Sequence, residues 1–186
     1  MAVVDIINDI QAKWQTMLAN CWSFRMHLQA DEGAIWSVAT ALTHVYHDVL
    51  PAPGSDAQEY TEAEFEAMLP AAFVWTCPQR GFELDGEAVG DSLNFYPNGM
   101  LKAVFIRQVA SGASNPDQTM RQWMSQIMYS GDTAKPGLVE LMKPSVGFSE
   151  PLAIHRMKMQ GPEFGRLEWF PELGAFQHAM LTVEYR

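Results

Sequence analysis

The sequence predicts an α+β fold: a mostly antiparallel sheet of about four to five strands with helices packed on it, plus an N-terminal helical extension. Three observations support this prediction. Apolar residues recur at helical spacing near the start of the chain and again after Asn115. The segment AAFVWTC at 71–77 is apolar throughout, which is typical of a strand buried on both faces. The last segment, from Ala175, alternates with the period of a strand.

The first part of the chain is predicted to be helical. One apolar stripe runs from Val3 to Leu18 at helical spacing, and a second stripe indicates a helix over about residues 33–49. The link at 22–28 is compatible with a helix or a strand, and we favour a strand. Residues 51–58 contain proline, glycine and serine, which predicts a loop.

A short capped helix and a hairpin are predicted next. Thr61 and Glu64 have the spacing of a capping box, in which each side chain accepts a hydrogen bond from the other residue's backbone N–H. Pro70 ends this helix, because proline disfavours helical geometry at the preceding residue. After the buried strand, the tripeptide Pro97-Asn98-Gly99 predicts a turn. Residues 100–109 are predicted to leave that turn as a long strand, in a hairpin or meander.

The strongest helix signal follows residue 115. Asn115 is suited to cap the helix, Pro116 occupies its first position, and Gly131 is placed to end it. A short helix is predicted after Pro136, and a further strand is predicted at 152–159.

The end of the chain carries two candidate contact regions. Trp169 and Phe170 lie in a predicted turn, and exposed aromatic side chains often anchor interfaces. In the last strand, odd-numbered positions form the predicted buried face, while even-numbered positions become polar toward Thr182, Glu184 and Arg186. This polarity indicates an edge or a side that faces another subunit.

Length and composition narrow the function classes. At 186 residues, a single domain (1–186) is expected. The net charge is −10, and the segment from Asp56 to Asp91 contains nine acidic residues and a single basic residue, Arg80. This charge argues against a nucleic-acid-binding surface.

No apolar run approaches ~18 residues, and the N-terminal segment lacks a basic region, so neither a membrane span nor a signal peptide is expected. Cys21 and Cys77 form no motif and are predicted to be reduced, buried thiols. Twelve Met and six Trp favour an oligomer.

No pattern of catalytic residues stands out. His44 and His47 lie three apart on the predicted second helix and could form a metal pair, but no third ligand has a recognisable spacing, so surface histidines are favoured. The sequence has no G-x-S-x-G, no glycine-rich phosphate loop and no H-E-x-x-H. We therefore expect no enzyme activity, no catalytic residues, no cofactor and no bound metal.

The order of these parts resembles the tail terminator (tail-tube-completion) proteins of long-tailed bacteriophages, the lambda-type minor tail family. The resemblance rests on FEAMLPAAFVW, the strand MLKAVFIRQV, the helix after Asn115 with Trp123 and Met124 on its inner face, and the C-terminal strand AMLTVEYR. It covers about residues 60–186, the α+β core, and leaves 1–59 as an N-terminal helical part that is longer than this family suggests. The acidic stretch at 80–98 is also long for the family.

This resemblance implies a structural virion protein of the tail or neck, assembled in the cytoplasm of the bacterial host. Such proteins form a homo-oligomeric, hexameric ring that caps the tail tube, stops its growth and receives the head–tail connector. The implied partners are the major tail tube protein and the connector or neck protein, and DNA passes through the bore without specific binding. An acidic lining would let the duplex slide, so the expected bore-lining residues are Glu83, Asp85, Glu87 and Asp91. The expected contact for an axial partner is Trp169 with Phe170, and the expected inter-subunit strand carries Thr182, Glu184 and Arg186.

Other functions remain open at the level of sequence. A head–tail connector or neck adaptor of the same particle would also form an acidic ring, but would bind the portal instead of the tube. A small non-viral α+β binding domain, or a bacterial protein that neutralises a toxin, would fit the acidity as well.

Overall fold

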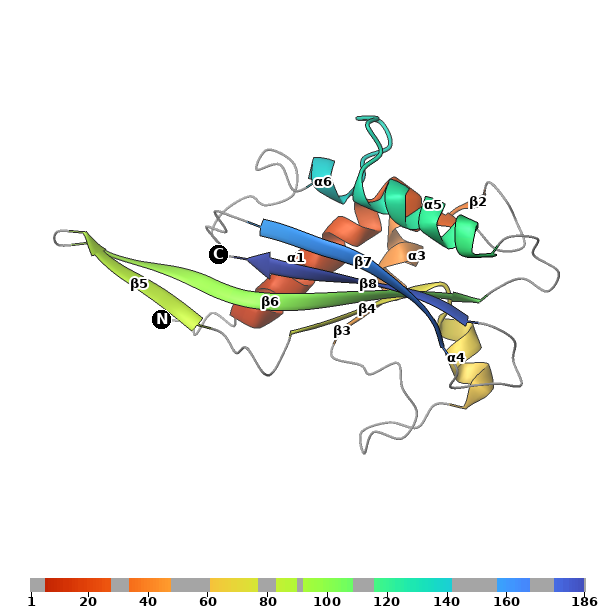
Figure 1. Cartoon of the computed structure of the whole chain (residues 1–186), viewed down its shortest axis with the longest axis horizontal. Coiled ribbons are helices and arrows are strands. Elements are labelled where there is room, and N and C mark those ends of the chain that lie inside the picture. The colour runs from red at the N-terminus through yellow and green to blue at the C-terminus, as the bar shows by residue number, and fades with distance from the viewer. Residues whose placement is uncertain are drawn as a thin grey trace.

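The structure is a computed structural model, and it describes residues 6–27, 34–47, 61–76, 83–89, 92–108, 116–141, 157–167 and 176–185. Helices pack on a mixed sheet, so the predicted α+β class is confirmed (Figure 1). The helices are α1 (Ile6–Asn20), α2 (Trp22–Arg25), α3 (Val38–Thr43), α4 (Glu62–Met68), α5 (Pro116–Met128) and α6 (Leu138–Leu141). The strands are β1 (Met26–His27), β2 (Ala34–Ile35), β3 (Val45–His47), β4 (Ala71–Thr76), β5 (Glu83–Val89), β6 (Ser92–Gln108), β7 (Met157–Leu167) and β8 (Phe176–Tyr185).

The main sheet has the strand order β3-β4-β6-β8-β7. Strand β3 runs parallel to β4, and the other neighbours are antiparallel. Among the described strands, β5 pairs with the first part of β6 alone, from Ser92 to Asn98, whereas β8 pairs with the rest of β6, from Gly99 to Gln108. The long strand β6 therefore belongs to the sheet at one end and to a two-stranded hairpin at the other.

One face of the sheet is covered by α1, α2 and α5. The core on this face includes Trp14 and Leu18 of α1, Phe105 of β6 and Trp123 of α5, all of them buried. The ring of Phe24 is stacked on Trp123 with centroids 6.3 Å apart and meets Phe105 edge-on. The N-terminal helices are thus part of the domain's core rather than an appendage to it. Each large apolar side chain buried in this way contributes roughly 1.5–3 kcal/mol.

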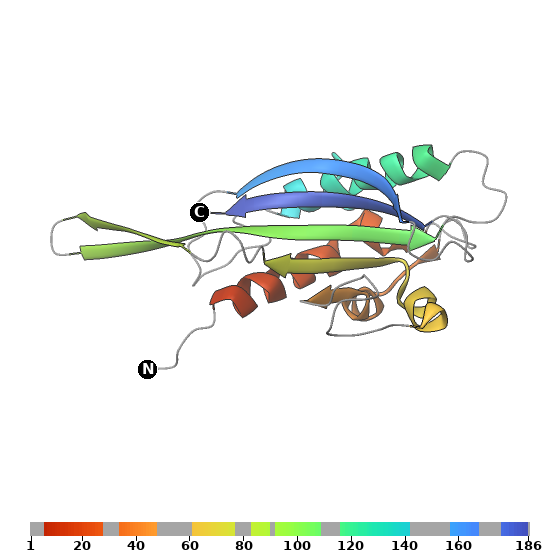
Figure 2. The ribbon, with the colours of Figure 1, turned by 60° about the horizontal axis from the view of Figure 1, so that its bottom comes forward.

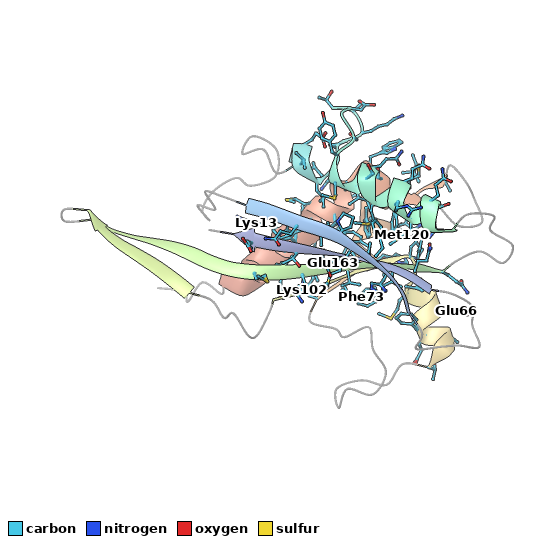
Figure 3. All side chains as sticks on the ribbon, in the orientation of Figure 1. Lys13, Glu66, Phe73, Lys102, Met120 and Glu163 are labelled. Carbon is cyan, nitrogen blue, oxygen red and sulfur yellow. The ribbon has the colours of Figure 1, made fainter. Side chains whose placement is uncertain are left out.

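The opposite face is covered at one end by α4. Phe65 of α4 and Phe73 of β4 are fully buried there, together with Ile106 of β6. Figure 3 shows Phe73 on the side of α4 and Met120 on the side of α5. Ala71 to Val74 are buried as a run, with Ala72 and Val74 under the helical layer and Ala71 and Phe73 toward α4. The prediction that this strand is buried on both faces is confirmed.

Two helix signals in the sequence are confirmed. Glu64 Oε2 accepts a hydrogen bond from the Thr61 N–H at 2.8 Å, and the Thr61 hydroxyl accepts one from the Glu64 N–H at 3.4 Å, which completes the capping box. The helix after residue 115 is α5, and its apolar stripe of Met120, Trp123, Met124 and Ile127 is buried.

The predicted second helix at 33–49 is wrong in extent. Only Val38–Thr43 is helical, with β2 before it and β3 after it. Ser37 caps the short helix by accepting a hydrogen bond from the Thr40 N–H. Val45–His47 instead pairs in parallel with Ala72–Val74, so hydrogen bonds to a distant strand override the local helical spacing. The favoured strand at 22–28 is also partly wrong, because Trp22–Arg25 is helical and only Met26–His27 is extended.

The turn predicted at Pro97-Asn98-Gly99 is wrong, because β6 passes through it without reversing. Val89 pairs with Ser92, so the chain reverses between these two residues.

The predicted strand at 152–159 is confirmed over 157–159, the part that the structure describes, and it extends further. Residues 152–156 lie outside the described part, and β7 runs on to Leu167. A register shift between Gln160 and Glu163 marks a β-bulge, with Gly161 at φ +108°. Glycine adopts this left-handed conformation without the steric cost that other residues incur.

Candidate assembly surfaces

The β5–β6 hairpin, residues 83–98, projects beyond the body of the sheet, and we call it the arm (Figure 2). Its base is the point where β6 leaves β8, since Gly99 pairs with Tyr185 and the preceding residues pair with β5 alone among the described strands. The described helices end short of the arm in both views (Figure 1 and Figure 2). The arm therefore stands apart from the rest of the described chain.

One face of the arm is acidic. In an antiparallel pair, residues directly opposite each other share a face, and alternate residues of a strand share it as well. Glu83, Asp85 and Glu87 therefore share a face. Their partners on β6 are Asn98, Tyr96 and Asn94. Three of the four predicted bore-lining residues are thus brought together, and the fourth, Asp91, lies outside the described residues.

The other face of the arm is apolar. Its pairs are Leu84 with Pro97, Gly86 with Phe95 and Ala88 with Leu93. These positions on β6 are odd-numbered, like Leu101, Ala103 and Phe105 in the body, which lie in the core under the helices. The apolar face of β6 thus continues from the body into the arm, but the helices that cover it in the body do not.

Strand β8 is a central strand, paired on one side with β6 and on the other with β7. Of the two alternatives expected from its polarity, an edge or a side that faces another subunit, the edge is therefore wrong. The alternation of its two faces is confirmed, because Ala179, Leu181 and Val183 are buried while Thr182 and Glu184 are half-buried on the side facing away from α1 and α5. The even-numbered residues of β8 thus become polar toward its end because this face of the sheet is incompletely covered, and not because the strand has an unpaired edge. That Thr182 and Glu184 meet another subunit stays a prediction, and Arg186 lies outside the described residues.

The open part of this sheet face is polar. Gln160 of β7 donates a hydrogen bond to Glu184 of β8 at 3.1 Å, and Lys102 of β6 lies opposite Thr182. Figure 3 shows Lys102 on the sheet, away from Glu66 of α4, which covers the other end. The surface resembles a solvated sheet face more than a pocket.

The end of the sheet farthest from the arm carries arginine. Arg107 lies opposite Gln177 of β8, which in turn lies opposite Arg166 of β7. Arg107 is only 4% exposed, and its Nε and Nη1 have no hydrogen-bond partner among the described residues. Burial lowers the pKa of its guanidinium from the ordinary value. On β7, Phe164 lies nearby and is 47% exposed. Sequence patterns did not point to this end, because its residues come from three separate strands.

The remaining candidates are structural or lie outside the described chain. His44 Nδ1 is 3.0 Å from the Met68 carbonyl oxygen, and its ring is stacked on Trp36 at 4.3 Å, so it ties α3 to α4. His47 lies on β3, so the two histidines do not share a helix face as the spacing suggested. Trp169, Phe170 and Cys77 fall outside the described residues. Cys21 is buried as predicted, and burial raises the pKa of its thiol to about 11.

Within the described residues, no three His, Cys, Asp or Glu side chains are grouped so that they could hold a metal ion. Of the helices described, none combines the length and apolar character needed to cross a bilayer.

Comparison with known proteins adds no further assignment. No protein-family model matches the chain, and no curated protein sequence matches it.

Proposed function

We propose that this chain is a ring-forming structural protein of the tail terminator type, which caps the tail tube of a long-tailed phage, stops its growth and offers a surface for joining the head connector. The observation that carries this proposal is the arm, with its acidic face and its apolar face. A projecting hairpin of this kind suits a protein in which neighbouring subunits of an oligomer cover surfaces that the single chain leaves open.

The elements behind the family resemblance support the proposal by their position. The segments FEAMLPAAFVW, MLKAVFIRQV and AMLTVEYR supply α4 with β4, β6, and β8. The strands β4, β6 and β8 are adjacent in the sheet, and α5 covers one side of them through Trp123 and Met124. The resemblance therefore rests on one contiguous unit of the fold.

The acidic face supports a bore that DNA crosses. Glu83, Asp85 and Glu87 lie on one face, with no Lys or Arg in either strand of the arm. Duplex DNA carries about one negative charge per 1.7 Å, and basic residues would retain it by releasing counterions. A carboxylate-lined wall repels the duplex and lets it slide.

The proposal also names the binding partners of the chain and its location in the virion. The ring binds the end of the major tail tube on one side and the head connector or neck protein on the other, and it is part of the virion after assembly in the bacterial cytoplasm. Its role is architectural, so it needs no cofactor and catalyses no reaction.

Tail-tube assembly in vitro tests this function. A major tail tube protein of a long-tailed phage would be polymerised with and without the purified chain, and tube lengths and tube ends would be measured by electron microscopy. We expect shorter tubes with a ring at one end. Tubes of unchanged length with bare ends would contradict the proposal, and binding to portal particles in place of tubes would favour a connector.

A further inference from the structure

The connection from α5 to α6 contains a segment, residues 130–136, that we call the strap (Figure 1). Residues 131–135 are exposed, so the strap adds little to the apolar core. Segments with few buried apolar contacts open locally, without unfolding of the whole domain. The closed position of the strap therefore depends on a small set of polar contacts.

The carboxylate of Glu140 in α6 joins the two ends of the strap. Its Oε1 accepts a hydrogen bond from the Gly131 N–H at 3.0 Å, and its Oε2 accepts one from the Gly137 N–H at 2.9 Å. The Ser130 N–H donates a longer hydrogen bond to the same Oε2, at 3.5 Å. Hydrogen bonds to an ionised acceptor are roughly twice as strong as those between neutral groups. This one side chain thus carries much of the hold on the strap.

The second end of the strap closes against the last turn of α5. Gly137 is buried there, and a Cβ at this position would lie 3.0 Å from the carbonyl oxygens of both Gln126 and Ile127. This close approach favours glycine, which has no side chain to displace the helix end. The bond from Gly137 to Glu140 therefore fixes the strap against α5 as well as α6.

The strap also contacts the start of α2, where Cys21 is the N-cap residue. The Trp22 N–H donates a hydrogen bond to the Pro136 carbonyl at 3.1 Å, and the Lys135 ammonium lies 5.3 Å from the centre of the Trp22 ring. The Cys21 Sγ lies 3.7 Å from the carbonyl oxygen of Ile127, and the residue is fully buried. Cys21 thus lies where α2, the end of α5 and the strap meet.

We propose that Glu140 is the latch of this strap, and that local opening of the strap, and not unfolding of the domain, exposes the Cys21 thiol. When Glu140 releases the two ends of the strap, the contacts with Trp22 remain to hold it to α2. Glu140 is a positioning residue in this scheme, since it acts through the place of the strap. The inference concerns a different part of the molecule from the arm and does not rest on the proposed ring.

Amide hydrogen exchange and thiol labelling of the full chain test the latch together. Cys77→Ser leaves Cys21 as the only thiol. Mass spectrometry of a peptide spanning the strap reports its opening, and reaction with N-ethylmaleimide reports access to Cys21. In this background, Glu140→Ala should speed both processes by about 10- to 100-fold, the loss expected when hydrogen bonds to a charged acceptor are removed.

Two matched variants make the result specific. Glu140→Gln keeps one side-chain oxygen as an acceptor but removes the charge, so both rates should rise by an intermediate factor. Val139→Ala changes the exposed neighbouring side chain of α6 and leaves the carboxylate in place. Both rates should then stay within about twofold of those of the parent chain.

The two readouts separate opening of the strap from a change in the chemistry of the thiol. Burial, and to a smaller degree the negative charge of Glu140, raises the pKa of the Cys21 thiol to about 11. Loss of this charge alone would speed labelling but would leave hydrogen exchange of the strap unchanged. Faster labelling without faster exchange would therefore overturn the inference, and so would equal effects of Glu140→Ala and Val139→Ala.

The urea dependence of labelling gives a second test, which needs no change at Glu140. Local opening exposes little surface, so the labelling rate of the Cys77→Ser chain should depend only weakly on urea at low concentrations. A rate that rises from the start as steeply as global unfolding would show that Cys21 is reached by unfolding of the domain, and would overturn the inference. Tail-tube capping is measured independently of both readouts, so failure of the latch leaves the proposed function standing.

Discussion

Leu84 of β5 lies directly opposite Pro97 of β6. The pair places a proline, which a sequence pattern assigns to a turn, inside a strand at the base of the arm. It also belongs to the apolar face that runs along the arm. The first mutation should therefore test whether this apolar face is needed for ring formation or for folding of the single chain.

Replacing Phe95 with Asp places a charge on the apolar face of the arm. Because the arm stands apart from the core, we expect the free energy of unfolding of the body to change by less than about 0.5 kcal/mol. The fraction of protein in the ring should fall sharply, because the arm can no longer be covered without burying a carboxylate. Denaturant titration and size-exclusion chromatography measure the two effects. A large fall in the free energy of unfolding with an unchanged fraction of ring would show that the face serves the fold of the monomer instead.

Trp123→Phe should destabilise the domain. The indole Nε1–H of Trp123 donates a hydrogen bond to the buried carbonyl of Ser23, and phenylalanine leaves that acceptor without its partner. We expect a loss of about 1–3 kcal/mol in the free energy of unfolding, measured by urea denaturation. Tyr129→Phe on the exposed side of the chain is the control and should change stability by less than about 0.5 kcal/mol. Equal effects for the two variants would argue against this packing of α5.

Gly161→Ala should also destabilise the domain, by about 1–3 kcal/mol. Gly161 has φ +108°, and a Cβ there would lie 2.7 Å from the carbonyl oxygen of Met180. Gly131→Ala is the matched comparison, since its φ is +71° but the nearest atom to a Cβ is an ordinary 3.6 Å away. Thermal melts should rank Gly161→Ala as the more damaging change. The reverse order would contradict the bulge in β7.

Stability should fall in two steps as the solution is acidified. Burial lowers the pKa of His178 below its ordinary value of 6.5, so the unfolded chain binds a proton that the folded chain excludes. Stability should therefore fall as pH drops through 6.5, and His178→Gln should flatten this step. For Glu140, partial burial raises the pKa, but backbone N–H groups of Gly131, Ser130 and Gly137 outweigh it and lower the pKa below 4.5, so its contribution is lost only below that pH. A rise in stability between pH 7 and 5.5 would contradict the first assignment.

The sequence predicted best the elements whose signals are local. The capping box of Thr61 and Glu64 and the stripe of α5 act within one or two helical turns, so their outcome did not depend on the rest of the fold. The apolar run from Ala71 was equally informative, because a strand buried on both faces cannot carry a polar side. These elements were enough to predict the fold class.

What the sequence missed depends on contacts between distant segments. Val45–His47 pairs with β4, more than twenty residues later, and this pairing decided against the helix that its apolar spacing favoured. Pro97-Asn98-Gly99 lies where β6 passes from β5 to β8, and the chain had already reversed between Val89 and Ser92. The acidic residues 83, 85 and 87 were identified from charge alone. Their alternation was a signal of a shared face, and it also indicated the apolar face opposite.

The mass of the native, full-length protein tests the central claim most directly. Native mass spectrometry would be run at the same concentration on the wild-type chain and on a chain in which a short glycine-serine turn replaces residues 84–97. The account predicts one closed oligomer, a hexamer, for the wild type and a folded monomer for the shortened chain. A wild-type chain that remains monomeric, or a shortened chain that still forms the same ring, would contradict it.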